Sequence, residues 1–457
     1  MAETLHCDLC VIGAGAGGLS VAAGASQMGA SVILVERDRM GGECLYTGCV
    51  PSKALLASAA RGEDFQAAFQ HVARAIAEIA PHDSIERFEG LGVRVITESA
   101  HFDGRRMLSA GRFEIRARRY VIATGSTPHV PDIPGIDDVP TLTNETLFTE
   151  CPEPSHLLIL GGGPVGIEMA QAFRRLGAQV SLVEAENILP HDDGELVAVV
   201  RQRLLDEGVA LHEQAKAVRA ARAGGDIVLA CNGPEGAFKL QGSHLLIAAG
   251  RTPNIGGLGL EAAGVQLQGG APVLDRRLRT TNRRIFAIGD VVGPYRFTHM
   301  AAYQAGIVLR NILFRLPARA KYQAVPWVTY SDPELAHVGL SEARARAAGI
   351  DIKILRYPFA ENDRAVAEGR TEGLVKAIVT PGGRILGAAI VGAHAGELIH
   401  VWSLAVSRRL KISAMAQAIT PYPTLSEAST RAAGSFYAPK LFSPRTKRIV
   451  RFLQRLG

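Results

Sequence analysis

The sequence has little of what marks secreted, membrane or fibrous proteins. Only six of its 457 residues are cysteines, too few for a disulfide scaffold in so long a chain. Its uncharged stretch at residues 9–35 is interrupted by six glycines, which favours a strand, a turn and a helix over a membrane span. No basic segment precedes this stretch, so a signal peptide is not expected. These absences indicate a cytoplasmic protein of two to four domains.

Acidic residues are missing from the C-terminal end. Seven basic residues lie beyond position 430, and the rest of the chain is nearly neutral, with 43 basic and 44 acidic residues. A general nucleic-acid-binding surface is therefore not expected. After Ser443-Pro444, apolar residues recur at helical spacing beside arginines: Ile449, Phe452, Leu453 and Leu456. Such a helix can contact an anionic membrane or an acidic partner, or it can pack on its own domain.

What the sequence does contain is a repeated pattern. An apolar run at residues 8–12 leads to Gly13-x-Gly15-x-x-Gly18, and one at 156–160 leads to Gly161-x-Gly163-x-x-Gly166. In both copies a helical stretch ends at a glycine, a second apolar run follows, and an acidic residue stands 23 positions after the first glycine. These acidic residues are Glu36 and Glu184.

This pattern is typical of a strand–helix–strand unit that binds a dinucleotide. The first glycine allows a tight turn, the second lets the backbone approach the pyrophosphate, and the third lets the helix pack against the strand. The helix N-terminus stabilises the phosphate charge, and the acidic residue binds ribose hydroxyls. Two copies in matching register predict two nucleotide-binding units.

Three further strand ends carry candidate binding residues. Residues 120–123 lead to Gly125-Ser-Thr127-Pro128, and residues 245–248 lead to Gly250-Arg-Thr252-Pro253. Residues 284–288 end at Gly289-Asp290, where a carboxylate can accept hydrogen bonds from a polyol. A helix is expected to open at Thr298-His299-Met300-Ala301, with its N-terminal dipole directed at an anionic group.

Between the first unit and the next strand stands a cysteine pair, in Gly41-Gly42-Glu43-Cys44-Leu-Tyr46-Thr-Gly48-Cys49-Val-Pro51-Ser52-Lys53. Two cysteines five apart on a straight helix are about 7.5 Å apart along its axis. A disulfide needs Cα atoms within roughly 7 Å, so this segment is predicted to be irregular near Gly48. Pro51 favours a helix start just beyond Cys49. The helix N-terminus and Lys53 would lower the pKa of the thiol.

This segment resembles the redox motif of the pyridine nucleotide-disulfide oxidoreductases, which include dihydrolipoamide dehydrogenase, glutathione reductase and mercuric reductase. The similarity extends to Ala123-Thr124-Gly125, Gly250-Arg251-x-Pro253-Asn254, Gly289-Asp290 and Asp332-Pro333-Glu334. It implies an α/β fold with two Rossmann-like dinucleotide-binding domains and a C-terminal α+β dimerisation domain. The implied boundaries are residues 1–147 with 275–320 for FAD, 148–274 for NAD(P)H, and 321–457 for the dimerisation domain of a homodimer.

The resemblance also implies residue roles. Cys49 would lie against the flavin as the charge-transfer thiolate, Cys44 would be the outer interchange thiol, and Asp290 would hold the ribityl chain. Lys53 and Glu168 would form an ion pair beside the flavin. The FAD-binding set would be Gly13, Gly15, Gly18, Glu36, Gly42, Lys53, Thr124, Gly125, Asp290 and Ala301.

For the nicotinamide cofactor the expected set is Gly161, Gly163, Gly166, Glu184 and Gly250. A carboxylate at Glu184 accepts hydrogen bonds from ribose hydroxyls and repels a 2′-phosphate, and no arginine stands beside it. NADH is therefore favoured over NADPH. No resident metal is expected.

The chain departs from the family pattern near its C-terminus. Thiol-specific members have His-Pro-Thr-x-x-Glu, whereas this chain has Tyr422-Pro423-Thr424-x-x-Glu427. A neutral tyrosine is a poor base, and loss of general base catalysis typically costs about 10²–10⁴-fold in rate. Mercuric reductases resemble the chain in this tyrosine, but no cysteine follows Cys231 to match their C-terminal pair. Glu43 and Tyr46 also replace the usual threonine and asparagine. We therefore place the chain in a mercuric-reductase-like side branch.

Three functions remain open from the sequence. The first is an NADH-dependent disulfide or low-molecular-weight thiol reductase. The second is a metal-ion reductase. The third is a flavin-bearing redox subunit or sensor that acts through a partner.

Overall fold

The computed structural model describes residues 3–456. Its contacts divide the chain into two compact units. The first unit comprises the chain up to residue 161 with residues 172–183 and 216–321. The second comprises residues 162–171, 184–215 and the chain from residue 322. The second glycine-rich pattern thus contributes to both units, and the three-domain boundaries expected from the sequence stay a prediction.

The first unit is built on a mixed sheet whose strand order is β3-β2-β1-β6-β5-β4, with β19 beside β6. Its parallel strands are β1 (Glu3–Ile12), β2 (Val32–Glu36), β3 (Val93–Thr97), β6 (Phe113–Ile122) and β19 (Ile285–Ala287). The antiparallel ones are β4 (Ala100–Gly104) and β5 (Met107–Ala110). The apolar run predicted as a strand at residues 8–12 and the second apolar run, which ends before Glu36, lie in the adjacent strands β1 and β2 of this sheet.

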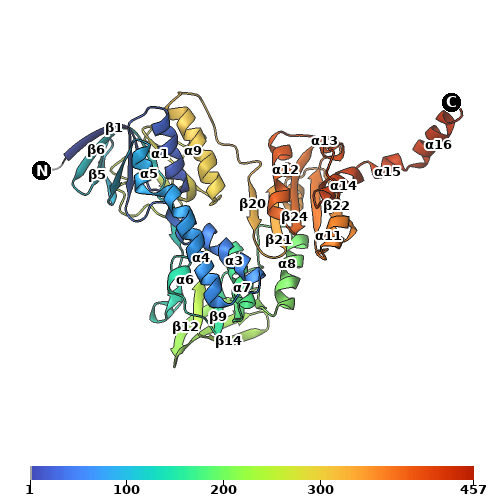
Figure 1. The fold of residues 1–457 in the computed structure, drawn as a ribbon, viewed down its shortest axis with the longest axis horizontal. Coiled ribbons are helices and arrows are strands. Elements are labelled where there is room, and N and C mark those ends of the chain that lie inside the picture. Colours follow the sequence, from blue (N-terminus) through green and yellow to red (C-terminus); the bar gives the residue numbers. More distant parts are fainter. Residues whose placement is uncertain (1–2, 457) are drawn as a thin grey trace. The chain divides into compact units, whose positions relative to one another are not determined.

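Two helices, α1 (Ala16–Gln27) and α9 (Thr298–Ile312), pack together on one face of this sheet (Figure 1). Leu19 and Val21 of α1 and Val308 of α9 join Leu9 and Val11 of β1 in one buried cluster. Alternate residues of β1, such as Cys10 and Ile12, point into a second cluster on the opposite face. Because both faces are buried at residues 9–12, this end of β1 is a continuous apolar run.

The strands of a second sheet that belong to the first unit have the order β10-β9-β15-β8 with parallel pairing. Its strands are β8 (Thr141–Leu142), β9 (His156–Leu160), β10 (Gln179–Val183) and β15 (His244–Ile247). An antiparallel sheet follows along the chain, with β12 (Lys216–Ala223), β13 (Asp226–Gly233) and β14 (Gly236–Gly242). The helix α7 (Pro164–Arg175) opens directly after the second glycine-rich loop.

The two Thr-Pro segments that echo each other in the sequence lie side by side. They form β7 (Ser126–Pro128) and β16 (Arg251–Pro253), which pair antiparallel with Thr127 opposite Thr252. This pair of short strands links the ends of β6 and β15. Candidate binding residues follow each of these two strand ends.

The second unit contains an antiparallel sheet of order β20-β21-β24-β23-β22. Its strands are β20 (Pro326–Thr329), β21 (Glu334–Gly339), β22 (Lys353–Pro358), β23 (Leu374–Val379) and β24 (Ile385–Gly392). The fully buried Trp402 of α12 (Ala395–Ser407) packs in its core and donates a hydrogen bond to Ser429 of α14 (Glu427–Ser435).

The remaining helices are α2 (Gly42–Tyr46), α3 (Cys49–Ala60), α4 (Phe65–Ile79), α5 (Ile85–Gly90) and α6 (Leu147–Glu150) in the first unit. Those of the second are α8 (Gly194–Asp206), α10 (Glu342–Ala347), α11 (Asp363–Ala367), α13 (Ile412–Ala416), α15 (Ala438–Leu441) and α16 (Pro444–Leu453). Across residues 3–456, no helix combines the length and the apolar character that crossing a bilayer requires.

Candidate functional site

Two glycine-rich loops leave their strands in the same way. A Cβ on Gly13 would lie 2.4 Å from the Ala123 carbonyl oxygen, and one on Gly161 would lie 2.4 Å from that of Ala248. Both glycines also have positive φ, of 100° and 112°, so a larger residue is excluded at the start of each loop. The sequence pattern therefore reflects a close backbone contact at both positions.

The acidic residues after the two patterns make matching contacts. Glu36 accepts hydrogen bonds from the backbone N–H of Ala14, at 2.6 Å, and from that of Asp38, at 2.9 Å. Glu184 accepts from Gly162, at 2.6 Å, and from Glu186, at 2.9 Å. The internal repeat thus extends to individual hydrogen bonds, with each carboxylate fixed beside its loop.

The first loop fits a dinucleotide. A Cβ on Gly15 would meet nothing within 4 Å, so the loop faces open space where α1 begins. The first turn of α1 has no acidic side chain to occupy its N–H groups. Such a helix N-terminus binds the charge of a pyrophosphate. Gly163, in the second loop, likewise faces open space.

The cysteine segment lies directly against the first loop. The Gly41 N–H donates to the Ala14 carbonyl at 3.0 Å, and a Cβ on Gly42 would lie 2.7 Å from the Gly15 Cα. The predicted irregularity near Gly48 is confirmed, because α2 ends at Tyr46 and α3 begins at Cys49. The second helix begins two residues earlier than Pro51 suggested.

This break brings the two sulfur atoms together. Cys44 Sγ donates to Cys49 Sγ at 2.7 Å, within reach of disulfide formation after a small movement. Thr298 Oγ1, at the first residue of α9, lies 2.6 Å from Cys44 Sγ and 3.7 Å from Cys49 Sγ. The hydrogen bond to Cys49, and then burial, raise the pKa of the Cys44 thiol. In this geometry the proton stays on Cys44 and Cys49 accepts the hydrogen bond. The roles expected of the two thiols stay a prediction.

Lys53 lies one turn along α3 from Cys49, and its Nζ donates to Ser52 Oγ at 3.4 Å. Glu168 is buried in α7, and its Oε1 accepts from the Tyr330 N–H at 3.0 Å. Lys53 belongs to the first unit and Glu168 to the second. The ion pair expected between them stays a prediction.

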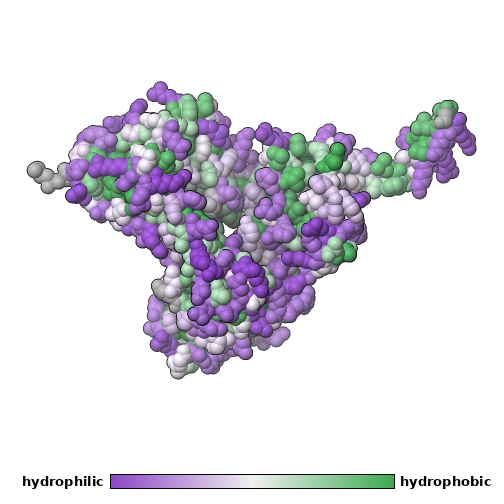
Figure 2. Space-filling view, viewed as in Figure 1, coloured by the Kyte–Doolittle hydropathy of each residue, from purple (hydrophilic) through white to green (hydrophobic). Residues whose placement is uncertain are grey.

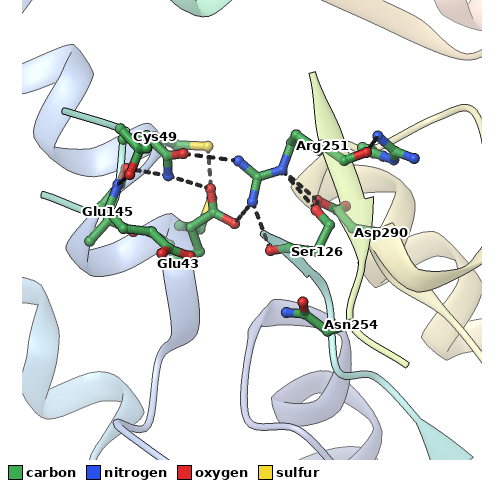
Figure 3. Close-up of polar contacts among 12 residues, drawn as sticks. Glu43, Cys49, Ser126, Glu145, Arg251, Asn254 and Asp290 are labelled. Atoms are coloured by element: carbon green, nitrogen blue, oxygen red, sulfur yellow. Dashed lines mark hydrogen bonds and ion pairs between the residues drawn. The ribbon is translucent and has the colours of Figure 1, made fainter. Parts of the chain in front are cut away.

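Beside the cysteines a polar network joins four segments of the first unit (Figure 3). Glu43 pairs with the Arg251 guanidinium and accepts a hydrogen bond from Asn144 Nδ2 at 2.7 Å. Asn144 also donates to the Thr47 carbonyl at 3.1 Å, which ties it to the cysteine segment. Arg251 donates to Ser126 Oγ at 2.7 Å and to its carbonyl at 2.8 Å.

The network ends at Asp290, the residue expected to hold a ribityl chain. Ser126 Oγ donates to Asp290 Oδ2 at 3.0 Å, and Arg251 Nε lies 4.0 Å from the same oxygen. Burial raises the pKa of the Glu43 carboxyl to about 7; the Arg251 charge opposes this rise, and the Asp290 and Glu145 charges add to it. Glu43 is therefore a carboxyl that titrates near neutral pH.

Other predicted residues surround the same strand ends. Thr124 Oγ1 donates to the Asn254 carbonyl at 2.6 Å, and Asn254 Nδ2 donates to the Thr124 carbonyl at 3.1 Å. Gly125 and Gly250 flank the paired segments β7 and β16. In α9, Ala301 is buried, and its Cβ would lie 3.3 Å from a Cβ on Gly17. The structure thus brings the predicted strand-end residues together, while their contacts with a cofactor stay predictions.

The C-terminal candidates lie in the second unit. Tyr422 is 69% exposed, and its hydroxyl donates to Asp363 Oδ2 at 2.8 Å. This hydrogen bond to a carboxylate raises the pKa of the phenol. Glu427 opens α14 and lies 3.8 Å from Arg431. The phenol is therefore held in its neutral, hydrogen-donating form.

Sequence reasoning missed four polar residues of this site: Ser126, Asn144, Arg251 as a partner of Glu43, and Thr298 as a partner of the thiols. Each is separated from its partner by more than 100 positions. The one signal in the sequence was Glu43, which replaces the usual threonine. An added charge at this position indicates that a residue of opposite charge lies nearby.

The other cysteines are structural. Cys7, Cys10, Cys151 and Cys231 are buried, and burial raises the pKa of the Cys7 thiol to about 12. Within residues 3–456, no group of three or more His, Cys, Asp and Glu side chains is arranged to hold a metal ion. Cys44 and Cys49 are thus the cysteines of the described chain that are not buried.

Known proteins match along almost the whole chain. Residues 7–305 match the family described as pyridine nucleotide-disulphide oxidoreductase, and residues 325–433 match its dimerisation domain. The chain is 37% identical to a mercuric reductase of Streptomyces lividans, covering 94% of this chain and 96% of the relative. It is 34% identical to a dihydrolipoyl dehydrogenase of Thermus scotoductus, covering 94% and 97%.

Solved structures agree with these matches. The HOCl-induced flavoprotein disulfide reductase RclA from Escherichia coli, in its Cu(II) complex, superposes with a TM-score of 0.87 at 30% identity. The alignment covers 93% of this chain and 98% of that one. The dimerisation domain supports a homodimer. The chain therefore belongs to the pyridine nucleotide-disulphide oxidoreductases, a family of FAD-dependent enzymes that use NAD(P)H.

Proposed function

We propose that the protein passes an electron pair from NADH, through FAD, to a Cys44–Cys49 disulfide and on to a small disulfide-type acceptor. The observation that carries this proposal is the pair of sulfurs 2.7 Å apart, on a segment packed against the first nucleotide loop. FAD, when bound, would supply the relay between a hydride donor and the disulfide.

The residues account for both halves of the exchange. Two electrons and one proton convert the disulfide to a Cys44 thiol and a Cys49 thiolate. The Cys44 sulfur then attacks the acceptor disulfide and forms a mixed disulfide, while one acceptor thiolate is expelled and takes up the proton that Cys44 loses. Cys49 then attacks the Cys44 sulfur, which releases the second acceptor sulfur as a thiolate and restores the disulfide.

Glu184 supports NADH as the electron donor. Its carboxylate is fixed at the end of β10 by two backbone N–H groups, where ribose hydroxyls are bound in dinucleotide-binding folds. A 2′-phosphate at this place would add negative charge beside a carboxylate. NADPH is therefore the poorer donor in this proposal.

A second candidate is the reduction of a metal ion as substrate. Relatives of the chain bear the name mercuric reductase, and the RclA structure is a Cu(II) complex. Two thiols 2.7 Å apart present adjacent soft ligands, which suit such ions. The substrate Hg(II) would take two electrons to become Hg(0), which requires no proton from Tyr422.

An acceptor panel tests these proposals. The holoenzyme is mixed with NADH and, in turn, lipoamide, oxidised glutathione, an aromatic disulfide and Hg(II), and NADH oxidation is followed. Turnover with a disulfide that is lost in Cys44→Ser supports the first proposal, and turnover with Hg(II) alone supports the second. Reduction by NADH without turnover on any acceptor would refute both and leave a redox subunit acting through a partner.

A further inference from the structure

The C-terminal helix α16 is the most amphipathic exposed element of the second unit. Ser443 begins it as N-cap, accepting from the Thr446 N–H at 3.2 Å, and Thr446 Oγ1 donates to the Lys440 carbonyl of α15 at 2.7 Å. The helix predicted after Ser443-Pro444 is thus confirmed. None of its residues is buried.

One face of this helix is apolar. Ile449, Phe452 and Leu453 are 49%, 60% and 57% exposed, and Leu456 in the turn that follows is 68% exposed. Their spacing of three and four residues places them in a single stripe along the helix. Large apolar side chains gathered in this way indicate a binding surface rather than scattered exposure.

The opposite face is mainly basic. At about 100° per residue, Lys447, Arg448, Arg451 and Arg455 fall within an arc of about 100°, apart from the apolar stripe. Gln454 falls beside them, and Arg445, in the first turn, falls on the side of the stripe. Figure 2 shows the two faces as green and purple sides of the C-terminal helix. No acidic residue follows Glu427 in the sequence, so no carboxylate from this helix offsets the charge.

We propose that α16 lies on an anionic lipid surface, with its apolar stripe inserted among the acyl chains and its basic side chains at the phosphates. An interfacial helix has this combination of a continuous apolar face, a basic polar face and low overall hydrophobicity. Charge complementarity with anionic headgroups involves every ionised side chain of the helix, since all of them are cations.

A second copy of the chain offers almost no net charge of the opposite sign outside its C-terminal end. Of the 50 basic residues, 43 precede position 431, against all 44 acidic ones, so the remainder of a copy is close to neutral. The match to the dimerisation domain ends at residue 433, before this helix. The helix thus stands outside the region that the family uses for dimerisation.

Vesicle sedimentation of the full-length holoenzyme tests this surface. We expect at least tenfold stronger partition onto phosphatidylglycerol–phosphatidylcholine vesicles than onto pure phosphatidylcholine, with a loss at high salt. Each basic residue near the surface contributes about fivefold to binding. Changing Lys447, Arg448, Arg451 and Arg455 to Gln should therefore abolish partition at any practical lipid concentration.

A matched control removes the same charge elsewhere. The exposed residues Arg74, Lys216, Lys239 and Arg283, changed to Gln, should leave vesicle binding within about twofold of wild type. The double variant Phe452→Ser and Leu453→Ser keeps the charge and should lose most of the binding. NADH oxidation with a soluble acceptor should be equal in all variants.

Four outcomes would overturn the proposal. The first is no partition of the wild type onto anionic vesicles. The second is equal loss of binding in the helix variants and in the charge-matched control. The third is a change in oligomeric mass by light scattering in the helix variants without vesicle binding, which would assign the helix to a second copy. The fourth is a wild type that binds an acidic protein but does not bind vesicles, which would contradict the proposed lipid contact.

Discussion

The Arg251 guanidinium forms an ion pair with the Glu43 carboxylate, one residue before Cys44 in the sequence. The same guanidinium bonds Ser126, whose hydroxyl donates to Asp290 at 3.0 Å. The cysteine segment and the strand end expected to hold the ribityl chain are therefore linked by four side chains. A threonine in place of Glu43 would leave Arg251 without this charge partner.

The raised pKa of Glu43 predicts a specific pH dependence of stability. The pKa of this carboxyl rises from 4.5 to about 7 because of burial. The folded state thus holds the proton more tightly than the unfolded chain. The stabilising contribution of that proton is complete below pH 4.5 and is lost as the pH rises through about 7. Glu43→Gln cannot lose a proton, so its Tm should rise relative to wild type between these pH values and stay level above them.

The exposed Glu235 serves as the matched control for Glu43. Glu235→Gln should follow the wild-type Tm at every pH. A constant offset of Glu43→Gln, equal at pH 4 and pH 8, would mean that Glu43 acts only through shape and hydrogen bonding.

The sulfur geometry predicts different spectra for the two cysteine variants. Because the Cys44 thiol keeps its proton and donates a hydrogen bond to Cys49 Sγ, we expect the thiolate of the reduced pair on Cys49. Reduction by NADH should give long-wavelength charge-transfer absorbance from that thiolate to FAD. Cys49→Ser should abolish the band, whereas Cys44→Ser should have it before any reduction. The reverse pattern would exchange the roles of the two thiols.

Glu184 predicts the choice of nicotinamide cofactor. We expect NADH to exceed NADPH by at least about tenfold in kcat/KM, or roughly 1.4 kcal/mol. Glu184→Ala should narrow this ratio, because it removes the charge that opposes a 2′-phosphate. Glu186→Ala removes an exposed carboxylate two residues away and should change the ratio less. Equal use of NADH and NADPH by the wild type would contradict this role.

A buried lysine predicts a large loss of stability. Lys376 in β23 is 3% exposed, and its Nζ lies 2.8 Å from Asp193, 2.8 Å from Glu195 and 2.9 Å from Glu342. Lys376→Met leaves these carboxylates without their shared cation, which should cost about 3–5 kcal/mol in the free energy of unfolding. The exposed Lys411→Met should change it by less than about 0.5 kcal/mol.

The ion pairs around Lys376 should contribute less to stability in acid. Hydrogen bonds from Arg356 and Lys376 lower the pKa of Glu195 from 4.5 to about 2. A lowered pKa means that the carboxylate's stabilising contribution is present above pH 4.5 and is lost as the pH falls toward 2. Urea unfolding at several pH values would measure this loss as a smaller difference in the free energy of unfolding between the wild type and Lys376→Met. A difference that stays constant down to pH 2 would argue against the contribution of these ion pairs.

The features that could be predicted from the sequence are those determined by residues close together in the chain. The glycine loops, the paired acidic residues and the break between Cys44 and Cys49 all follow from spacing, because turn geometry and helix rise act over a few residues. The partners of Glu43 did not follow, since Arg251 is 208 positions away and Asn144 is 101 away. Thr298 meets Cys44 only because α9 packs beside α1. Such contacts depend on the tertiary fold.

Tyr422 stands where thiol-specific relatives have a histidine. Its hydrogen bond to Asp363 makes loss of the phenol proton still less favourable. Its hydroxyl donates to Asp363 at 2.8 Å, and the hydrogen bond to that carboxylate raises the pKa of the phenol above its usual 10. At neutral pH it can donate a hydrogen bond, but it cannot take a proton from a thiol. Dihydrolipoamide oxidation should therefore be slow in the wild type, and Tyr422→His should raise its rate at least about tenfold, as acid–base catalysis allows.

Two further variants separate a chemical role of Tyr422 from a structural one. Tyr422→Phe keeps the ring and removes the donor, so it should slow acceptor reduction while leaving the reduction of the flavin by NADH unchanged. Asp363→Asn keeps a hydrogen-bond acceptor but removes the charge, so it should lower the phenol pKa toward its usual value and shift the alkaline limb of the pH–rate profile toward lower pH. Rapid wild-type oxidation of dihydrolipoamide that survives Tyr422→Phe would show that another group is the base, because a phenol that has been removed cannot accept the proton.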